Sequence, residues 1–454
     1  MNAREVGSAA DAIRLVETRG LEHVKLGLFD IDGVFRGKYV SVAKLKSALE
    51  KGFGFCDVVL GWDSSDQLYD NTQVSGWHTG YRDAAVRILP ETCRELPGEN
   101  TVLFLVEFDE SAREVCPRNL LRRVCDRARS MGFSPTGSVE FEFFLFDETS
   151  HTADEKRYRD LKPISPGYFG YSMLRNSVFS EFYEELLTTC RAMDFPLEGL
   201  HTETGPGVLE AAIEHTDALA AADRGALFKT YTKVLAQRRQ WMACFMAKWS
   251  PDYPGQSGHI HLSLRNDAGD PVFFDSKQDH GMSETMRHFI GGQQALLPEL
   301  AAMIAPTVNS FTRLIPGFWA PTAATWGIEN RTCALRAIFG SATSQRVEYR
   351  ITAADINPYI AIAAALGSGL WGIENRIEPD APVQGSAYDQ EFGPERALPA
   401  TLAEASIALG KSEAAAELFG VPFRDHFAAT RMWEEREYRK HISDWELKRY
   451  FEII

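Results

Sequence analysis

The first hundred residues carry short stretches of strand-like and helix-like periodicity. Residues 24–40 alternate apolar and polar side chains around a central Asp-Gly pair, which predicts two strands joined by a hairpin turn. Residues 8–19 have apolar side chains at helical spacing, and 101–108 return to a strand pattern. The polar stretch 58–71 shows little periodicity and is expected to be a loop. The pattern predicts a small β-rich domain at the start of the chain.

From Cys116 onward, longer strands and helices follow one another. Helices are expected at 118–131, 177–194, 217–248, 283–304, 358–374, 400–419 and 423–441, and strands at 138–146, 207–213, 258–265 and 346–352. Residues 376–399 are rich in Pro, Gly and acidic side chains, which predicts a surface loop. This alternation predicts an α/β arrangement after the small first domain, and we expect two domains, 1–112 and 113–454.

Composition narrows the class of protein. A chain of 454 residues with 44% hydrophobic and 24% charged residues can bury a substantial core. The net charge of −15 argues against a nucleic-acid partner. The seven cysteines lack CxxC spacing, and the longest apolar stretch, 359–371, is broken by Gly and Ser. We expect a cytoplasmic protein with no membrane partner.

Six scattered side chains are candidate ligands of divalent cations, which prefer carboxylate oxygens. They are Glu140, Glu142, Glu203, Glu210, His259 and Glu348. Glu140 and Glu142 are two apart on a strand, so both point to one face while Phe141 and Phe143 point to the other. An exposed amphipathic strand is the simpler interpretation of such a pair. The flanking apolar run argues instead for a buried strand, where unpaired carboxylates would be costly.

Two further strands repeat this alternation. His259 and His261 share one face of 258–264, and Arg346, Glu348 and Arg350 share one face of 346–351, which could also be a salt-bridged surface strand. Three arginines, Arg331, Arg336 and Arg350, flank the last ligand in the sequence. Arginine suits phosphate and carboxylate groups. Together, the candidate metal ligands and the arginines predict a site for a nucleoside triphosphate and an acid, as in an ATP-dependent ligase.

Six ordered phrases resemble the glutamine synthetase family over essentially the whole chain. They are VEFEFFLFD, ETGPGVLE (203–210), GQSGHIHLS, NSFTRLIPG (309–317), ENRTCALR (329–336), and RVEYR followed by NPYIAIAAAL (357–366). The resemblance implies an α+β fold, with a β-grasp N-terminal domain and a catalytic domain that has a curved antiparallel sheet packed with helices. It also implies two stacked hexameric rings, a dodecamer, with sites between adjacent subunits. The phrase SDWELKRYFEI (443–453) looks like the subgroup that ligates glutamate to organic amines.

The resemblance implies two or three Mg²⁺ or Mn²⁺ ions per site, with ATP as co-substrate. Glu142, Glu203 and Glu210 match the ligands of the ion that organises glutamate and the attacking amine. Glu140, His259 and Glu348 match the ligands of the ion that bridges the ATP phosphates, so that the γ-carboxylate of glutamate can be phosphorylated.

Other family positions are carried over one at a time. Arg313 and Arg350 match residues that bind glutamate, Arg331 one that acts on the transferred phosphoryl group, and Arg336 a contact of the ATP phosphates. His261, Ser263 and Arg346 are expected near the nucleotide. Gly255 matches a glycine that lets the backbone approach glutamate, and Tyr168 a tyrosine beside the ammonium pocket. Asp63 matches an aspartate offered to the neighbouring subunit's site, and with Arg331 and Glu210 it completes the expected catalytic set.

One position departs from the ammonia-using members of the family. Where they carry a glutamate that helps to bind ammonium, this chain has Trp319, in PGFWAPT. The exchange removes a charge-assisted interaction of about 1.5–3 kcal/mol, or about one to two decades of affinity. The central hypothesis is therefore an organic primary amine as nucleophile, giving a γ-glutamyl amide in amine breakdown. Trp319, with Phe318 and Trp62, favours an apolar alkyl or aryl group over a polyamine.

Alternatives remain open at this stage. Trp319 could only repack the flap of an ordinary ammonia-dependent glutamine synthetase. The chain could instead be a non-catalytic structural member, or use the fold for another acid-activating reaction. Pro254 replaces a family asparagine that contacts glutamate, and Tyr388 lies near the tyrosine that some bacterial members adenylylate, in different surroundings.

Overall fold

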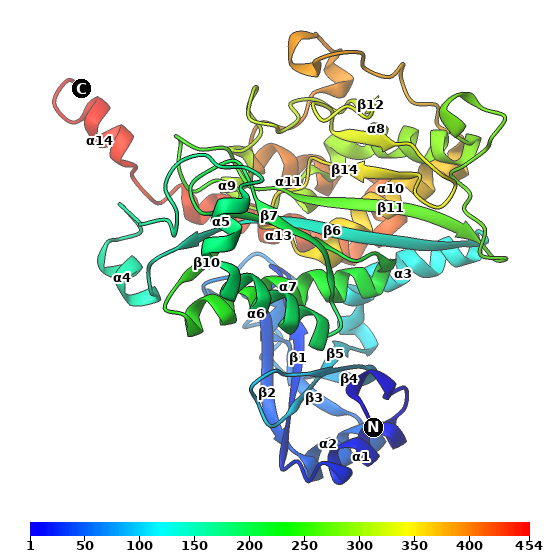
Figure 1. Ribbon diagram of the computed structural model, residues 1–454, viewed down its shortest axis with the longest axis vertical. Coiled ribbons are helices and arrows are strands. Elements are labelled where there is room, and N and C mark those ends of the chain that lie inside the picture. Colours follow the sequence, from blue (N-terminus) through cyan, green and yellow to red (C-terminus); the bar gives the residue numbers. More distant parts are fainter.

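The computed structural model describes all 454 residues and contains two separate sheets (Figure 1). The first sheet has the order β2 (Phe35–Ser41), β1 (His23–Phe29), β5 (Val102–Phe108), β4 (Asp83–Glu95) and β3 (Phe53–Cys56), with α1 (Ala9–Thr18) and α2 (Val42–Lys51) beside it. Strands β1 and β5 are parallel, and the other neighbours are antiparallel. Its core of 24 buried residues is drawn entirely from positions 3 to 116.

The predicted hairpin is confirmed. Strands β1 and β2 pair in register, from Phe29 opposite Phe35 to His23 opposite Ser41. Gly33 adopts a φ of 78°, which an L side chain rarely does, and its N–H donates to the carbonyl of Asp30 (3.0 Å). The Asp-Gly pair therefore acts as the turn signal.

The second sheet has nine strands and carries the candidate site. Its order is β12 (Trp326–Ile328), β13 (Leu335–Ile338), β14 (Arg346–Tyr349), β11 (Gly258–Asn266), β6 (Phe133–Phe146), β8 (Val208–Ile213) and β7 (Leu197–Thr202), and β9 (Thr216–Asp217) and β10 (Met242–Cys244) also pair with β6. The pairing is antiparallel as predicted, except that β12 and β13 are parallel. The long strand β6 is the centre of the sheet and pairs with four others.

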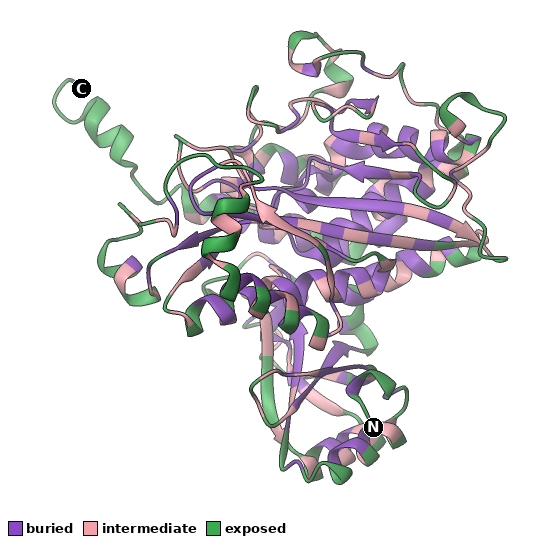
Figure 2. Ribbon diagram, viewed as in Figure 1, coloured by how far each residue is buried: buried purple, intermediate pink, exposed green.

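Helices pack against this sheet over a core of 79 buried residues (Figure 2). The long helices are α3 (Pro117–Ser130), α7 (Ala218–Arg238), α8 (Glu284–Ile304), α10 (Pro358–Asn375) and α13 (Val421–Tyr438). The shorter ones are α4 (Ser150–Glu155), α5 (Met173–Val178), α6 (Ser180–Ala192), α9 (Val308–Phe311), α11 (Leu402–Lys411) and α12 (Glu413–Phe419). Helices α8 and α10 meet at Gly292 and Gly372, where an added Cβ on Gly292 would lie 2.5 Å from the Gly372 backbone.

Three predicted helices end or divide differently. The helix predicted over 217–248 ends at Arg238, because Gln240 takes a left-handed φ of 59° and β10 then pairs with β6. The helix over 400–419 divides at Ser412, whose hydroxyl caps α12 by accepting from the Ala415 N–H (2.9 Å). The helix over 177–194 begins earlier, as α5, and divides at Phe179.

Buried polar side chains connect the small sheet to the helices that pack on the large sheet. Arg118 at the start of α3 donates to Glu107 of β5 (2.8 Å) and with two nitrogens to Asp223 of α7 (2.8 and 2.9 Å). Burial would raise the pKa of Glu107, but Arg118 is foremost among the groups that hold it below its ordinary value. Asn357 before α10 donates to the Asp30 carbonyl of the hairpin (3.0 Å). The predicted boundary at residue 112 falls in the 3₁₀ turn Glu110–Glu114, between β5 and α3.

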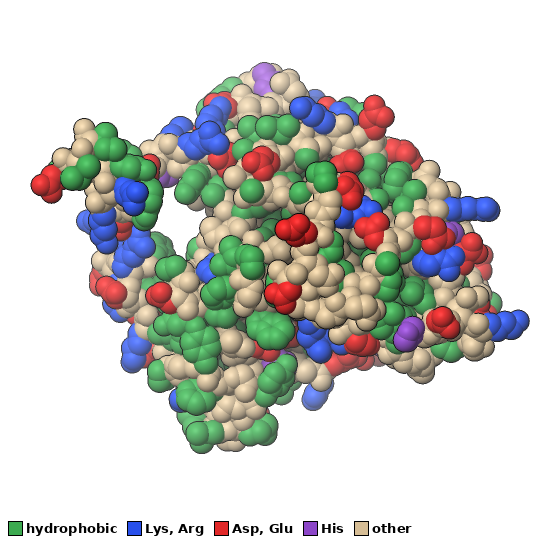
Figure 3. All heavy atoms as spheres, turned by 90° about the horizontal axis from the view of Figure 1, so that it is seen from above, with side chains coloured by type: hydrophobic (Ala, Val, Ile, Leu, Met, Phe, Trp, Pro, Cys, Tyr) green, Lys and Arg blue, Asp and Glu red, His purple; other side chains and the backbone are tan.

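The C-terminal arm, residues 443–454, stands clear of the body (Figures 1 and 3). It contains α14 (Asp444–Tyr450), and its apolar side chains are exposed, including Trp445, Phe451 (86% exposed) and Ile454 (94%). Exposed apolar side chains gathered in this way typify a contact surface. None of the helices combines the length and apolar character that crossing a membrane requires.

Candidate active site

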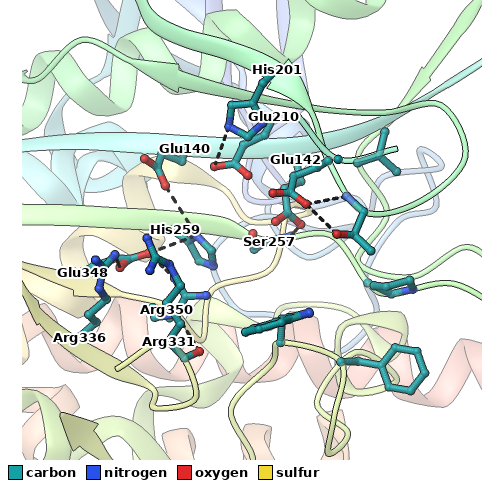
Figure 4. Close-up of a pocket in the computed structure, with 18 of the residues that line it drawn as sticks. Glu140, Glu142, His201, Glu210, Ser257, His259, Arg331, Arg336, Glu348 and Arg350 are labelled. Atoms are coloured by element: carbon teal, nitrogen blue, oxygen red, sulfur yellow. Dashed lines mark hydrogen bonds and ion pairs between the residues drawn. The ribbon is translucent and has the colours of Figure 1, made fainter. Parts of the chain in front are cut away.

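A cavity of about 540 Å³ opens over four neighbouring strands of the large sheet (Figure 4). Strand β6 contributes Glu140 and Glu142, β8 contributes Glu210, β11 contributes His259 and His261, and β14 contributes Arg346 and Glu348. Loops and strand ends add Gly170, Tyr171, His201, Glu203, Thr204, Pro254, Gly255, Ser257, Arg313, Phe318, Trp319, Arg331 and Arg350, β13 adds Arg336 and β8 adds Val208. All six predicted metal ligands therefore line one cavity.

Strand β6 shows why the sequence produces this site. Phe141 and Phe143 are fully buried in the aromatic core under the sheet, where each packs against Phe228 and Phe245. The alternation of the strand then turns Glu140 and Glu142 to the opposite face, into the cavity. The buried-strand interpretation of this pair is confirmed.

Negative charge is in excess at one end of the cavity. Burial and the nearby Glu142, Glu140, Glu203 and Glu348 raise the pKa of Glu210 to about 9. A carboxyl group held in its protonated form by neighbouring carboxylates is in the environment that a divalent cation would stabilise. The donor set at this end therefore fits a hard metal ion.

The other end is balanced by cationic side chains. Burial would raise the pKa of Glu348, but His259 and Arg350 are foremost among the groups that lower it to about 2. Arg350 pairs with Glu348, and Arg336 donates to it (3.0 Å). Figure 4 shows these two arginines and Arg331 together on the Glu348 side of the cavity.

Two histidines of β11 face Glu140. The Nδ1 of His259 lies 3.7 Å from a Glu140 oxygen and 3.4 Å from Glu348, and the Nε2 of His261 lies 3.3 Å from Glu140. Burial would raise the pKa of Glu140, but His261 and His259 hold it well below its ordinary value. Potential ligand atoms of Glu140, His261 and Glu348 lie within 4.8 Å of one another. The expected set had His259 in that place, and both rings border it.

Arg313 and Gly255 form one unit. The Arg313 side chain is 2% exposed and donates to the carbonyls of Ile351 (2.9 Å) and Arg350 (3.3 Å). A Cβ at position 255 would lie 2.6 Å from both Arg313 Cγ and the Ala247 carbonyl oxygen. Glycine is thus required at position 255 to seat Arg313, as well as for any approach of a ligand to the backbone.

A second cavity of about 280 Å³ adjoins the first and shares Glu140, His261 and Arg346 with it. Ser263 lies in this second cavity, where its hydroxyl lies 2.7 Å from that of Thr136. Arg346 donates to Nδ1 of His261 (3.1 Å) at the border of the two cavities. The predicted nucleotide contacts thus span both cavities, with Arg336 in the first alone.

Three residues singled out from the sequence lie outside both cavities. Asp63 is 7% exposed and accepts from Trp433 Nε1 (3.0 Å) and from the N–H groups of Ser65 (2.8 Å) and Gln67 (2.9 Å). Tyr168 is half exposed and donates to the Asp252 carbonyl (2.9 Å). Trp62 stacks on Arg36 of the small sheet. Within one copy of the chain, none of them reaches the carboxylate cluster.

The flap around Trp319 forms part of the cavity wall. Trp319 is 57% exposed and adopts a left-handed φ of 57°, and Gly317 also has a positive φ, 81°. Beside it, Phe318 covers the buried amine of Lys248, 4.4 Å from the ring centre, and Tyr388 donates to the Ala320 carbonyl (3.0 Å). The indole is therefore presented on a bent, anchored loop.

Sequence reasoning missed His201 and Tyr171. His201 is the next-to-last residue of its strand and lies two positions before Glu203, the same spacing that singled out Glu140 and Glu142, so this signal could have found it. Tyr171 stacks on the His201 ring, with centroids 4.5 Å apart. No periodicity marks Tyr171, because it lies in an irregular loop with a positive φ.

Comparison with known proteins agrees with this geometry. Residues 114–450 match the family "Glutamine synthetase, catalytic domain". The chain is 45% identical to type-1 glutamine synthetase 2 of Dictyostelium discoideum, over 95% of this chain and 84% of the relative. It is 36% identical to glutamate–isopropylamine ligase of Pseudomonas sp, over 97% of both chains. The solved structure of apo GmaS superposes with a TM-score of 0.84 at 26% identity, covering 98% of this chain and all of that one.

The fold and the site thus define an ATP-dependent ligase of the class that uses divalent metal ions. The chain belongs to the glutamine synthetase family. The resemblance inferred from the six sequence phrases is confirmed, and so is the expected fold of the catalytic domain.

Proposed function

We propose that the protein ligates L-glutamate to a primary organic amine with an apolar alkyl or aryl group. ATP would phosphorylate the γ-carboxylate, and the amine would displace phosphate to give a γ-glutamyl amide, ADP and phosphate. The observation that carries the proposal is Trp319, a half-exposed indole on the cavity wall where ammonia-using relatives of the family have a carboxylate. We also propose a role in amine breakdown, with the γ-glutamyl amide as the first product.

The rest of the cavity supports an uncharged amine substituent. Its apolar lining consists of Val208, Pro254, Phe318 and Trp319. Every carboxylate that lines it is one of the six predicted metal ligands, so this chain has no carboxylate to spare for the second ammonium of a polyamine. The similarity to glutamate–isopropylamine ligase also supports an alkylamine.

We assign the six carboxylate and histidine side chains to Mg²⁺ or Mn²⁺, two or three ions per site. The ions would offset the repulsion between the glutamate carboxylate and the ATP phosphates. Glu142, Glu203 and Glu210 would serve one ion, and Glu140, His259 and Glu348 another. The raised pKa of Glu210 supports this assignment, because burial and the neighbouring carboxylates both disfavour the charged form that a bound cation would stabilise.

The arginines would hold the anionic substrates. Arg313 and Arg350 would bind glutamate, and Arg331, which lines the same cavity as the carboxylates, would stabilise the transferred phosphoryl group. Arg336 would bind the ATP phosphates. His261, Ser263 and Arg346 would line the path of the nucleotide from the first cavity into the second.

We also propose that the working form is a dodecamer of two hexameric rings. The exposed apolar arm supports association, because a free chain would leave it in water. Asp63 would then act in the site of a neighbouring copy, and Tyr168 would border its amine pocket. Seven free cysteines, five of them buried, support a cytoplasmic setting.

The test is phosphate release with ATP, Mg²⁺ or Mn²⁺ and L-glutamate, with ammonium, isopropylamine, ethanolamine, putrescine and aniline supplied one at a time. We expect the highest kcat/KM with an alkylamine or arylamine, and its γ-glutamyl amide in the mass spectrum. The 45% identity to a type-1 glutamine synthetase favours ammonia as the second candidate. Highest efficiency with ammonium would establish that candidate, and metal and ATP binding without turnover would indicate a structural role.

A further inference from the structure

His201 is placed as a metal ligand would be, although its position was not among the expected ligands. It is the next-to-last residue of β7, and its ring lies beside Glu210 in the cavity (Figure 4). Ligand atoms of His201, Glu203 and Glu210 lie within 4.8 Å of one another. The His201 Nε2 is 4.0 Å from the nearest Glu210 oxygen.

The hydrogen bonding of the ring determines which nitrogen is available. Nδ1 lies 3.2 Å from the Thr202 carbonyl oxygen, which can only accept, so Nδ1 carries the proton. The neutral ring then directs the lone pair of Nε2 toward Glu210. Histidines that bind metals commonly donate their other ring N–H to a carbonyl in this way.

The 4.0 Å separation between His201 Nε2 and the nearest Glu210 oxygen indicates the kind of contact between them. It is too long for a hydrogen bond between His201 and Glu210. Two ligands of one ion at about 2.1 Å each lie about 3.0–4.2 Å apart, depending on the angle at the metal. The separation therefore fits two ligands of a shared ion.

Neighbouring contacts hold the three groups in place. Tyr171 stacks on the His201 ring with an interplanar angle of 26°. One oxygen of Glu203 accepts from the N–H (2.5 Å) and hydroxyl (3.0 Å) of Thr204. Glu142, expected in this set, instead accepts from the Ser257 N–H (2.7 Å) with one oxygen.

We propose that His201 Nε2 is a direct ligand of the divalent ion held by Glu203 and Glu210. The site would then contain one imidazole nitrogen, which suits Mn²⁺ better than the oxygen-preferring Mg²⁺. The inference rests on the proposed function only for the presence of a metal at this end of the cavity, and not for the identity of the amine.

Electron spin echo spectroscopy of bound Mn²⁺ tests the contact directly, because a coordinated ¹⁴N modulates the echo. The background His259→Asn/His261→Asn removes the two other cavity imidazoles, and less than one equivalent of Mn²⁺ is added to the assembled protein. We expect ¹⁴N modulation in this background and its loss when His201→Asn is added. Modulation that survives His201→Asn, or is absent from the background, would overturn the proposal.

If the multiple variant does not fold, titration calorimetry on single variants tests the same ligand through its effect on metal affinity. Mn²⁺ and Mg²⁺ are titrated separately into wild type, His201→Asn and the control His151→Asn, an exposed histidine of α4. His201→Asn should lower the Mn²⁺ to Mg²⁺ affinity ratio about tenfold or more, and His151→Asn should leave it unchanged. An unchanged ratio in His201→Asn would contradict direct ligation.

The outcomes separate this inference from the proposed function. If Mn²⁺ binds through His201 but no amine is ligated, the proposed reaction fails and the ligand assignment stands. If amines are ligated and the ratio is unchanged, only the His201 assignment fails. If no divalent metal binds to the wild type, both fail.

Discussion

The residues of the proposed site differ in their electrostatic surroundings and in their exposure to solvent. Glu210 is surrounded by four other carboxylates, whereas Glu348 is compensated by arginines and histidines. Trp319 presents an apolar surface at the cavity wall, where we propose that the amine enters.

Replacing Trp319 with glutamate should convert the amine preference. A carboxylate at the cavity wall would gain a charge-assisted interaction of about 1.5–3 kcal/mol with ammonium. We expect kcat/KM for ammonium to rise about tenfold to a hundredfold, and kcat/KM for an apolar amine to fall. The control Trp319→Phe should keep the preference for the amine. An unchanged ammonium to amine ratio in Trp319→Glu would show that the indole only packs the flap.

The raised pKa of Glu210 predicts how stability depends on pH. Between its ordinary value of 4.5 and about 9, the folded metal-free protein binds a proton that the unfolded chain has lost. Stability should therefore fall as pH rises from 6 to 9, and Mn²⁺ or Glu210→Gln should reduce that fall. Thermal melting of the metal-free protein at each pH measures this. If the stability of Glu210→Gln falls equally over the same pH range, a group other than Glu210 causes the fall.

At the scale of elements, the sequence revealed strands with clean alternation better than irregular ones. The faces of β6 follow directly from Glu140 and Phe141, but β4 escaped prediction because its pairing with β5 is interrupted between Leu89 and Arg94. The end of α7 depends on β10 pairing with β6, a contact between distant segments that local periodicity does not carry. The two-residue alternation could have identified His201, but it could not have identified Tyr171.

The C-terminal arm gives a prediction at this scale. Removing residues 443–454 deletes an exposed apolar segment that makes few contacts with its own chain, so the remaining fold should be retained. We expect the truncated protein to form a smaller assembly, with its circular dichroism spectrum unchanged. Light scattering after size exclusion measures the mass. A mass per assembly reduced only by the missing residues would show that the arm is not an assembly contact.

At the scale of the whole molecule, the proposed dodecamer would form each complete site between two copies of the chain. Asp63 lies outside the cavity of its own chain and is tied to Trp433, and Arg331 lies inside the cavity. If Asp63 serves a neighbouring copy, then mixed oligomers of Asp63→Asn and Arg331→Ala should regain about a quarter of the wild-type sites after random assembly. The two variants alone should stay nearly inactive. Mixing without recovery would place each site within one chain.

The most direct test of the central claim is competition between nucleophiles in a single reaction. Equal concentrations of ammonium and isopropylamine are supplied with saturating ATP, metal and L-glutamate, and the two products are quantified by mass spectrometry at low conversion. Their ratio reports the ratio of kcat/KM values for the two nucleophiles. The account predicts that γ-glutamylisopropylamide exceeds glutamine. Glutamine in excess would contradict the amine-ligase assignment and leave an ammonia-dependent glutamine synthetase.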